Sequence, residues 1–123
     1  LILVKEHLNK EDIPFELPEN HRKARYNKSW NSKWFEKFPN AIRDTLFLNN
    51  KLKKITGEKE YKKNDIFCFS IFKSNFAPKY DHFAVYIGEN QIYHHPINRY
   101  PSVEDFGKFY KSKLVDVYRY LES

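Results

Sequence analysis

The sequence contains one cysteine, three glycines and no methionine, and each shortage limits the structures that the chain can form or its relation to the gene product. A single cysteine, Cys68, excludes an internal disulfide. Three glycines leave few positions for tight turns, which favours a mixture of helices and strands over an all-β chain. No apolar run is long enough to cross a bilayer and no secretory leader opens the chain, so we expect a soluble protein. Because the sequence begins at Leu1 and contains no methionine, we expect it to be the C-terminal piece of a longer protein.

The size and composition indicate one domain with a basic surface. The 123 residues are 41% hydrophobic and 18% aromatic, which suits a single core filled by large side chains. The net charge of +6 arises from lysines and arginines that cluster at 21–28 and 51–63. Such a surface favours polyanionic partners, among them nucleic acid, wall polymers and anionic membrane faces. A solvated, lysine-rich surface is the simpler explanation of most of these charges.

Apolar periodicity divides the chain into a helical half at 1–63 and a sheet half at 64–123. Leu1, Val4 and Leu8 recur at helical spacing, and aromatic residues recur at three- and four-residue steps before Pro39. The expected helical segments are 1–12, 29–37 and 40–46, with an irregular loop at 14–28.

In the second half, short runs rich in β-branched and aromatic residues predict strands. The expected strands are 66–72, 83–87, 91–95 and 114–121, and a turn at 88–90 joins the second and third into a hairpin. Ser102 and Asp105 have the spacing of a capping box, which predicts a helix from 102 to about 110. Helices followed by an antiparallel sheet indicate an α+β fold.

Two histidines in the predicted hairpin are the strongest candidates for chemistry. Strand alternation places His82, Ala84 and Tyr86 on one face and the apolar residues between them on the other. We expect the apolar face to meet the core, so that His82 points toward the helical layer or a cleft. Pairing across the turn places His94 opposite Ala84, so the rings of His82 and His94 should be neighbours. Two neighbouring imidazoles suit a relay in which one ring acts as a base near neutral pH and the other orients it. Two half-exposed strand histidines without a role are the alternative.

The same segment resembles the cell-wall endopeptidases of the NlpC family. That family reads like His-Val-Gly-Ile-Tyr-Leu-Gly with a second His twelve positions after the first, and here Ala84, Tyr86 and Gly88 stand between His82 and His94 at the corresponding places. Members from phage tail tips are more similar still, with His-Ala-Ala-Ile-Tyr and a double His that resembles Ile92-Tyr93-His94-His95. Upstream, Asn64-Asp65-Ile66 resembles the Pro-Gly-Asp-Val that begins the family's first strand.

The resemblance implies a papain-like fold in which N-terminal helices pack on an antiparallel sheet of about four to six strands, with the active cleft between them. It implies a cysteine peptidase that hydrolyses peptidoglycan stem peptides at the host cell wall, without a cofactor or metal. It also implies a place in the virion tail tip among other tail proteins. His82 would be the general base and His94 would orient it. The nucleophilic cysteine is expected immediately before Leu1, because Leu3-Val4-Lys5 and Ile13-Pro14 resemble the residues C-terminal to that cysteine in tail-tip members.

Other interpretations stay open. Cys68 lies mid-strand, where burial raises the pKa of a thiol, and we expect it to be a core residue. Asp81, His82, His94 and His95 could ligate zinc, although adjacent strand residues such as His94 and His95 point to opposite faces. The chain could also be an inactive structural tail component of the same fold. A basic nucleic-acid-binding module is a further alternative, and the sequence contains no recognised base-reading or phosphate-binding motif.

Overall fold

The computed structural model describes residues 2–16, 50–56, 60–71, 82–96 and 100–121, and the statements below concern these residues. The elements are α1 (Ile2–Lys10), β1 (Leu52–Ile55), β2 (Ile66–Phe69), β3 (His82–Gly88), β4 (Gln91–His94), β5 (Ser102–Asp105), α4 (Lys108–Lys113) and β6 (Leu114–Tyr120). The strands form one six-stranded sheet in the order β1-β6-β2-β3-β4-β5, and all neighbours run antiparallel. The expected α+β class with an antiparallel sheet is therefore confirmed.

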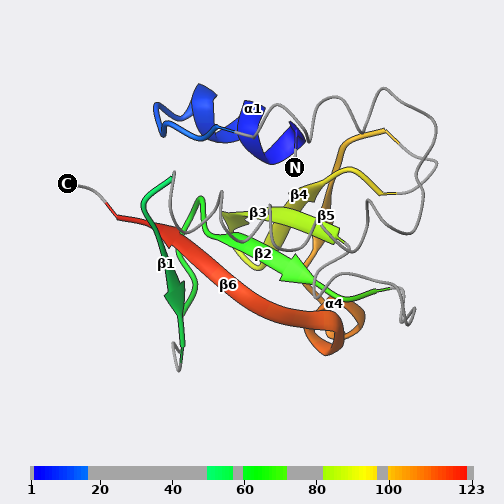
Figure 1. The fold of residues 1–123 in the computed structure, drawn as a ribbon. Helices are drawn as coiled ribbons and strands as arrows, with labels where there is room; N and C mark the ends of the chain where they lie inside the picture. Colours follow the sequence, from blue (N-terminus) through cyan, green and yellow to red (C-terminus); the bar gives the residue numbers. More distant parts are fainter. Residues whose placement is uncertain (1, 17–49, 57–59, 72–81, 97–99, 122–123) are drawn as a thin grey trace, which may run out of the picture.

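Helix α1 lies across one face of the sheet (Figure 1). The helical spacing of Val4 and Leu8 turns both side chains toward the sheet, where each is buried. They pack in a core cluster with residues of β1, β2, β3 and β6: Leu52, Ile66, Cys68, Val85 and Tyr118. After Lys10 the chain reverses at Asp12, whose φ is 60°, and the backbone N–H of Ile13 donates to the carbonyl of Leu8.

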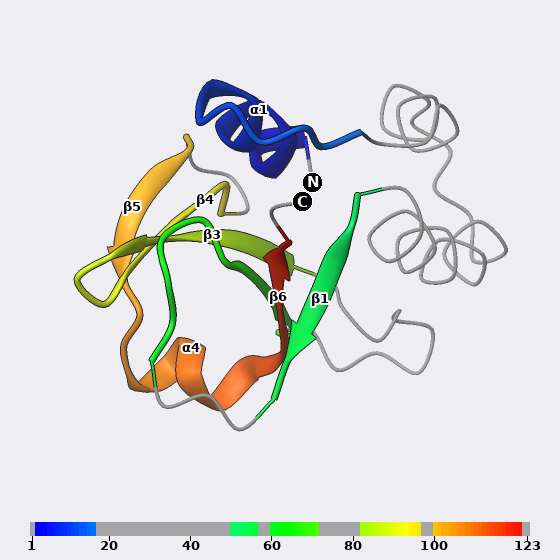
Figure 2. The ribbon, with the colours of Figure 1, turned by 90° about the vertical axis from the view of Figure 1, so that its left-hand side faces the viewer.

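The opposite face of the sheet is also covered by apolar side chains. A second cluster contains Phe67, Phe69, Ala84, Ile92, Phe106 and Val117. Because both faces are covered, every residue of β2 is buried. Figure 2 shows the sheet curving from β5 to β1, with α4 between β5 and β6.

Two expectations about secondary structure are wrong. Residues Ser102–Asp105 form strand β5 instead of starting a helix, because they pair with all four residues of β4. The helix begins only at Lys108, after Gly107, and no side chain caps it. Strand β1 was not expected within the helical half, since two of its four residues are lysines and only Leu52 is buried. The helices expected at 29–37 and 40–46 lie outside the described residues, as does most of the loop at 14–28.

The β3–β4 hairpin has the predicted register, with Ala84 opposite His94. Its turn runs through three successive residues with positive φ: Gly88 at 92°, Glu89 at 53° and Asn90 at 60°. Such a conformation suits glycine and asparagine, and it closes the hairpin with two residues between the paired Gly88 and Gln91. A bulge between Tyr86 and Gly88 then shifts the register by one residue, and the turn and the bulge together place His94 opposite Ala84.

Asp65 joins the start of β2 to β6 through a buried ion pair. The Nε and Nη2 atoms of Arg119 each donate to one carboxylate oxygen of Asp65 at 2.8 Å, and the backbone N–H of Lys62 donates to Oδ2 at 2.8 Å. The Asp65 side chain is 1% exposed and that of Arg119 is 20% exposed. Paired, charge-assisted bonds of this kind are directional, so they hold the chain that enters β2 beside the end of β6. No helix in the described part of the chain is long and apolar enough to span a membrane.

Candidate functional site

The rings of His82 and His94 are in direct contact. His82 is the first residue of β3 and His94 is the last residue of β4, and the hairpin register brings them to the same face. The Nε2 atom of His82 lies 2.7 Å from Nδ1 of His94, and the ring planes meet at 77°. The expectation that the two imidazoles are neighbours is confirmed.

The contact continues to a carboxylate on the next strand. Nε2 of His94 lies 2.5 Å from Oε2 of Glu104 on β5. The hydroxyl of Tyr110, on α4, donates to the same oxygen at 2.7 Å. His94 is 1% exposed, whereas the Glu104 side chain is 29% exposed. Four polar groups therefore form one chain of hydrogen bonds from the start of β3 to α4, which we call the His82–Tyr110 relay.

Glu104 and Tyr110 were not among the predicted site residues. The capping-box pattern assigned Ser102–Asp105 to a helix, and a helix gives no reason to place Glu104 beside His94. In that segment only Val103 favours a strand. A signal was nevertheless present, because a third strand added to the hairpin would place Ser102 and Glu104 on the face of His94.

The surroundings of His82 disfavour its protonated form. Burial is the main cause that lowers the pKa of His82 from 6.5 to about 4, and the neighbouring His94 adds to it, while Glu104 opposes this shift. The ring of His82 also packs near Phe69, with centroids 5.9 Å apart. His82 is therefore neutral near pH 7 and has a lone pair for accepting a proton.

The relay lies on the face of the sheet opposite α1. Ala84 and Tyr86, which share the face of His82, pack with the second cluster, whereas Phe83 and Val85 pack with the cluster beneath α1. Of the two directions expected for His82, the helical layer or a cleft, the first is wrong as far as α1 is concerned, because His82 faces away from that helix. Both faces of β3 carry apolar residues that pack in a core cluster. The alternation of residues along β3 therefore could not show which face of the strand α1 covers.

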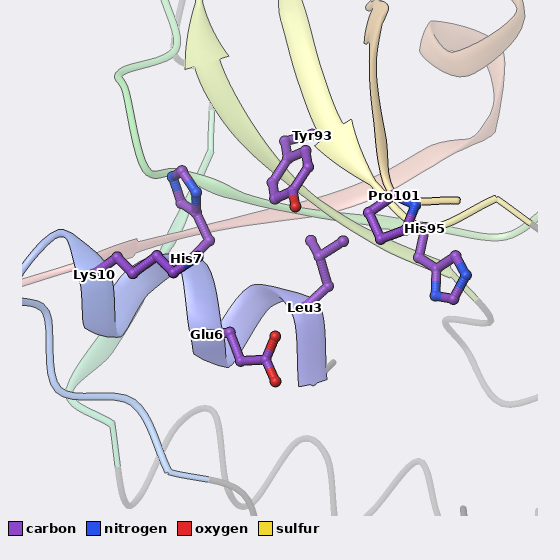
Figure 3. A pocket seen from close by; sticks show the side chains of 7 residues that line it. All are labelled: Leu3, Glu6, His7, Lys10, Tyr93, His95 and Pro101. Carbon is purple, nitrogen blue, oxygen red and sulfur yellow. The ribbon is translucent and has the colours of Figure 1, made fainter. Parts of the chain in front are cut away.

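A pocket of about 350 Å³ lies on the α1 side instead (Figure 3). It is lined by Leu3, Glu6, His7 and Lys10 of α1 and by Tyr93, His95 and Pro101 from the region of β4 and β5. Because His82, His94 and Glu104 do not line this pocket, its volume does not describe the surroundings of the relay.

The remaining candidate residues have other positions. Cys68 is buried in the core cluster beneath α1, which confirms the expectation that it is a core residue. His95 is exposed and lines the pocket beside α1, so it points away from His94, as the pleat of a strand requires. Asp81 lies outside the described residues. Within the described segments, no group of three or more His, Cys, Asp and Glu side chains is arranged to hold a metal ion.

No protein-family model matches this sequence, and no curated protein is significantly similar to it.

Proposed function

We propose that this chain is a cysteine endopeptidase module of the NlpC type, as carried by phage tail-tip proteins, and that His82 is its general base. The observation that carries the proposal is the 2.7 Å contact between His82 and His94. These are the two histidines whose spacing resembles the family, and the hairpin brings together the ring nitrogens that a base and its orienting group require.

The geometry suits proton abstraction by His82. Its Nε2 atom is engaged by His94, so Nδ1, on the other side of the ring, is the atom that remains for a thiol. In the proposed reaction the thiol proton moves to Nδ1 of His82, and the thiolate attacks the carbonyl carbon of a peptide bond. The protonated His82 then gives its proton to the leaving amine. Water, activated by the same ring, finally hydrolyses the thioester.

The nucleophile proposed for this reaction precedes Leu1. Cys68 is the only cysteine in the sequence, and it is fully buried among core residues. The start of α1 suits a thiolate, because its unpaired backbone N–H groups stabilise negative charge. The relay lies on the face opposite α1, so the proposal requires the thiol to reach Nδ1 of His82 past the first residue of β3.

The proposed substrate is the stem peptide of peptidoglycan, and the proposed location is the virion tail tip beside other tail proteins. Both rest on the resemblance of residues 64–123 to tail-tip members of the family. The codons that precede Leu1 give the first test. A cysteine codon within a few positions supports the proposal, and its absence contradicts it.

Cleavage of muropeptides by the full-length gene product gives the second test. We expect His82→Ala to lower kcat/KM by about 100-fold or more, because a positioned base contributes roughly 10² to 10⁴ in rate. His95→Ala is the matched control, since this nearby histidine is exposed and lies on the α1 side of the sheet. Equal losses in the two variants would contradict a specific role for His82.

A second candidate is a structural tail component with the same fold and no activity. It is favoured by Cys68, whose burial removes its thiol from any solvent-facing site. This candidate predicts no muropeptide turnover by the full-length product. It also predicts that His82→Ala assembles into tails as the unmodified protein does.

A further inference from the structure

We propose that Glu104, held in place by Tyr110, determines which ring nitrogen of His82 carries the proton. The inference rests on the proposed role of His82 as the base, and it assigns Glu104 and Tyr110 as positioning residues. Neither residue touches the reacting atoms. They act through His94, which lies between Glu104 and His82 in the relay.

The carboxylate of Glu104 is the origin of this order, because an ionised carboxylate can only accept hydrogen bonds. Oε2 of Glu104 is contacted both by the Tyr110 hydroxyl at 2.7 Å and by Nε2 of His94 at 2.5 Å. Two contacts on one oxygen favour the ionised form when both partners donate. In the proposed order Glu104 is ionised, so Nε2 of His94 carries the hydrogen of this contact.

A neutral His94 that donates from Nε2 has an unprotonated Nδ1, which can only accept. The partner of that atom is Nε2 of His82, at 2.7 Å, so His82 must donate there. A neutral His82 with its hydrogen on Nε2 has a lone pair on Nδ1. One carboxylate thus fixes the tautomers of two rings in sequence, and the outcome is a His82 that can accept a proton at the atom facing away from the relay.

Tyr110 contributes the position of the carboxylate. The Glu104 side chain is 29% exposed, and the Tyr110 hydroxyl bonds the same oxygen that His94 contacts. The ring of Tyr110 packs edge-on against His94, with centroids 5.3 Å apart and planes at 86°, while its hydroxyl donates to Glu104. The same tyrosine therefore contacts both members of the Glu104–His94 pair. It also packs against Phe69 at 5.7 Å, which ties it to the apolar cluster on this face.

The opposite order of hydrogen bonds is physically possible, which makes the inference testable. If His94 were protonated on both nitrogens, its Nδ1 would donate and Nε2 of His82 would accept. His82 would then carry its hydrogen on Nδ1, and it could not take a proton from a thiol there. The two arrangements differ at every nitrogen of His82.

Imidazole nitrogen chemical shifts, measured through two-bond proton–nitrogen correlations on the full chain near pH 7.5, distinguish these arrangements directly. We expect His82 and His94 each to have a protonated Nε2 and an unprotonated Nδ1. In Glu104→Leu, which removes the acceptor, we expect the single tautomer of His82 to become a mixture. Asp105→Leu is the matched control, since Asp105 is an exposed neighbour on the same strand, and it should leave both rings unchanged.

Tyr110→Phe provides a milder variant that removes one hydroxyl, and we expect a smaller shift of His82 toward the mixture. A protonated Nδ1 on His82 in the unmodified chain would overturn the inference. So would a folded Glu104→Leu protein in which both tautomers match those of the unmodified chain. The measurement uses no substrate, so its outcome is independent of muropeptide cleavage, which tests the proposed function.

Discussion

Replacing Asp65 by asparagine should be among the most destabilising isosteric changes in this domain. Oδ1 accepts one bond from Arg119, and Oδ2 accepts a second from Arg119 and a third from the backbone of Lys62. An asparagine has one oxygen and one NH₂ group, so either orientation of the amide places a donor against a donor. The carboxylate is also lost, which leaves the guanidinium of Arg119 without this partner in a site that is 20% exposed.

The magnitude depends on how completely the pair is buried. Removing one partner of a buried ion pair costs about 3–5 kcal/mol. Because Arg119 retains some contact with water, we expect about 3 kcal/mol for Asp65→Asn, at the lower end of that range. For a domain of this size such a loss lowers Tm by about 10 °C.

Urea unfolding, followed by tryptophan fluorescence and by circular dichroism, measures this loss. Asp105→Asn is the matched control, and we expect it to change the free energy of unfolding by less than about 0.5 kcal/mol because Asp105 is exposed. Adding Arg119→Leu to Asp65→Asn should recover part of the loss, since it removes the buried cation. A loss below about 1 kcal/mol for Asp65→Asn would refute the reasoning.

Three further predictions concern His82, the hairpin turn and the thiol. Because the pKa of His82 is lowered to about 4, the unfolded chain binds more protons than the folded chain between pH 4 and 6.5. The free energy of unfolding should therefore fall by up to about 3 kcal/mol as pH drops through this window. Urea titrations of His82→Gln should show a smaller fall. The same pH dependence in both proteins would contradict the lowered pKa of His82. Gly88→Ala should lower the free energy of unfolding by about 1 kcal/mol, because its φ of 92° disfavours a residue with a Cβ. The added Cβ meets no atom within 4 Å, so no steric cost is expected. Gly107→Ala is the control and should cost less, because the φ of Gly107 is negative. Cys68 is 0% exposed, so its reaction with a thiol reagent should require global unfolding, and fast labelling of the native protein would show that this thiol is accessible.

The hairpin and its histidine pair were predictable from the sequence because the information there is local. The turn residues Gly88 and Asn90 and the alternation around them indicate a register in which residues 88–90 separate the strands, and that register brings His82 to His94. The structure reaches the same pairing with two residues in the turn and a bulge between Tyr86 and Gly88. The four expected strands are all present for the same reason, with ends that differ by at most three residues.

The rest of the relay depends on the pairing of β5 with β4, which no local sequence pattern predicts. Residues Ser102–Asp105 form a strand because they pair with β4. This pairing outweighs the helical preference that the capping-box spacing of Ser102 and Asp105 indicates. Strand β1 similarly depends on β6, a partner from the far end of the sequence, since Leu52 pairs with Tyr120. The side of the sheet covered by α1 was not predictable either, because each face of β3 packs against an apolar cluster.

The His82–Tyr110 relay is built from consecutive pieces of chain, and each of its strands pairs with the strand before it. Its parts are β3, β4, β5 and the helix α4, whereas the Asp65–Arg119 pair joins positions 54 residues apart. Short separations cost little loop-closure entropy, so this stretch can assemble without waiting for the rest of the sheet. Changes in the first half of the chain can therefore alter what approaches His82 while leaving its hydrogen-bond order intact.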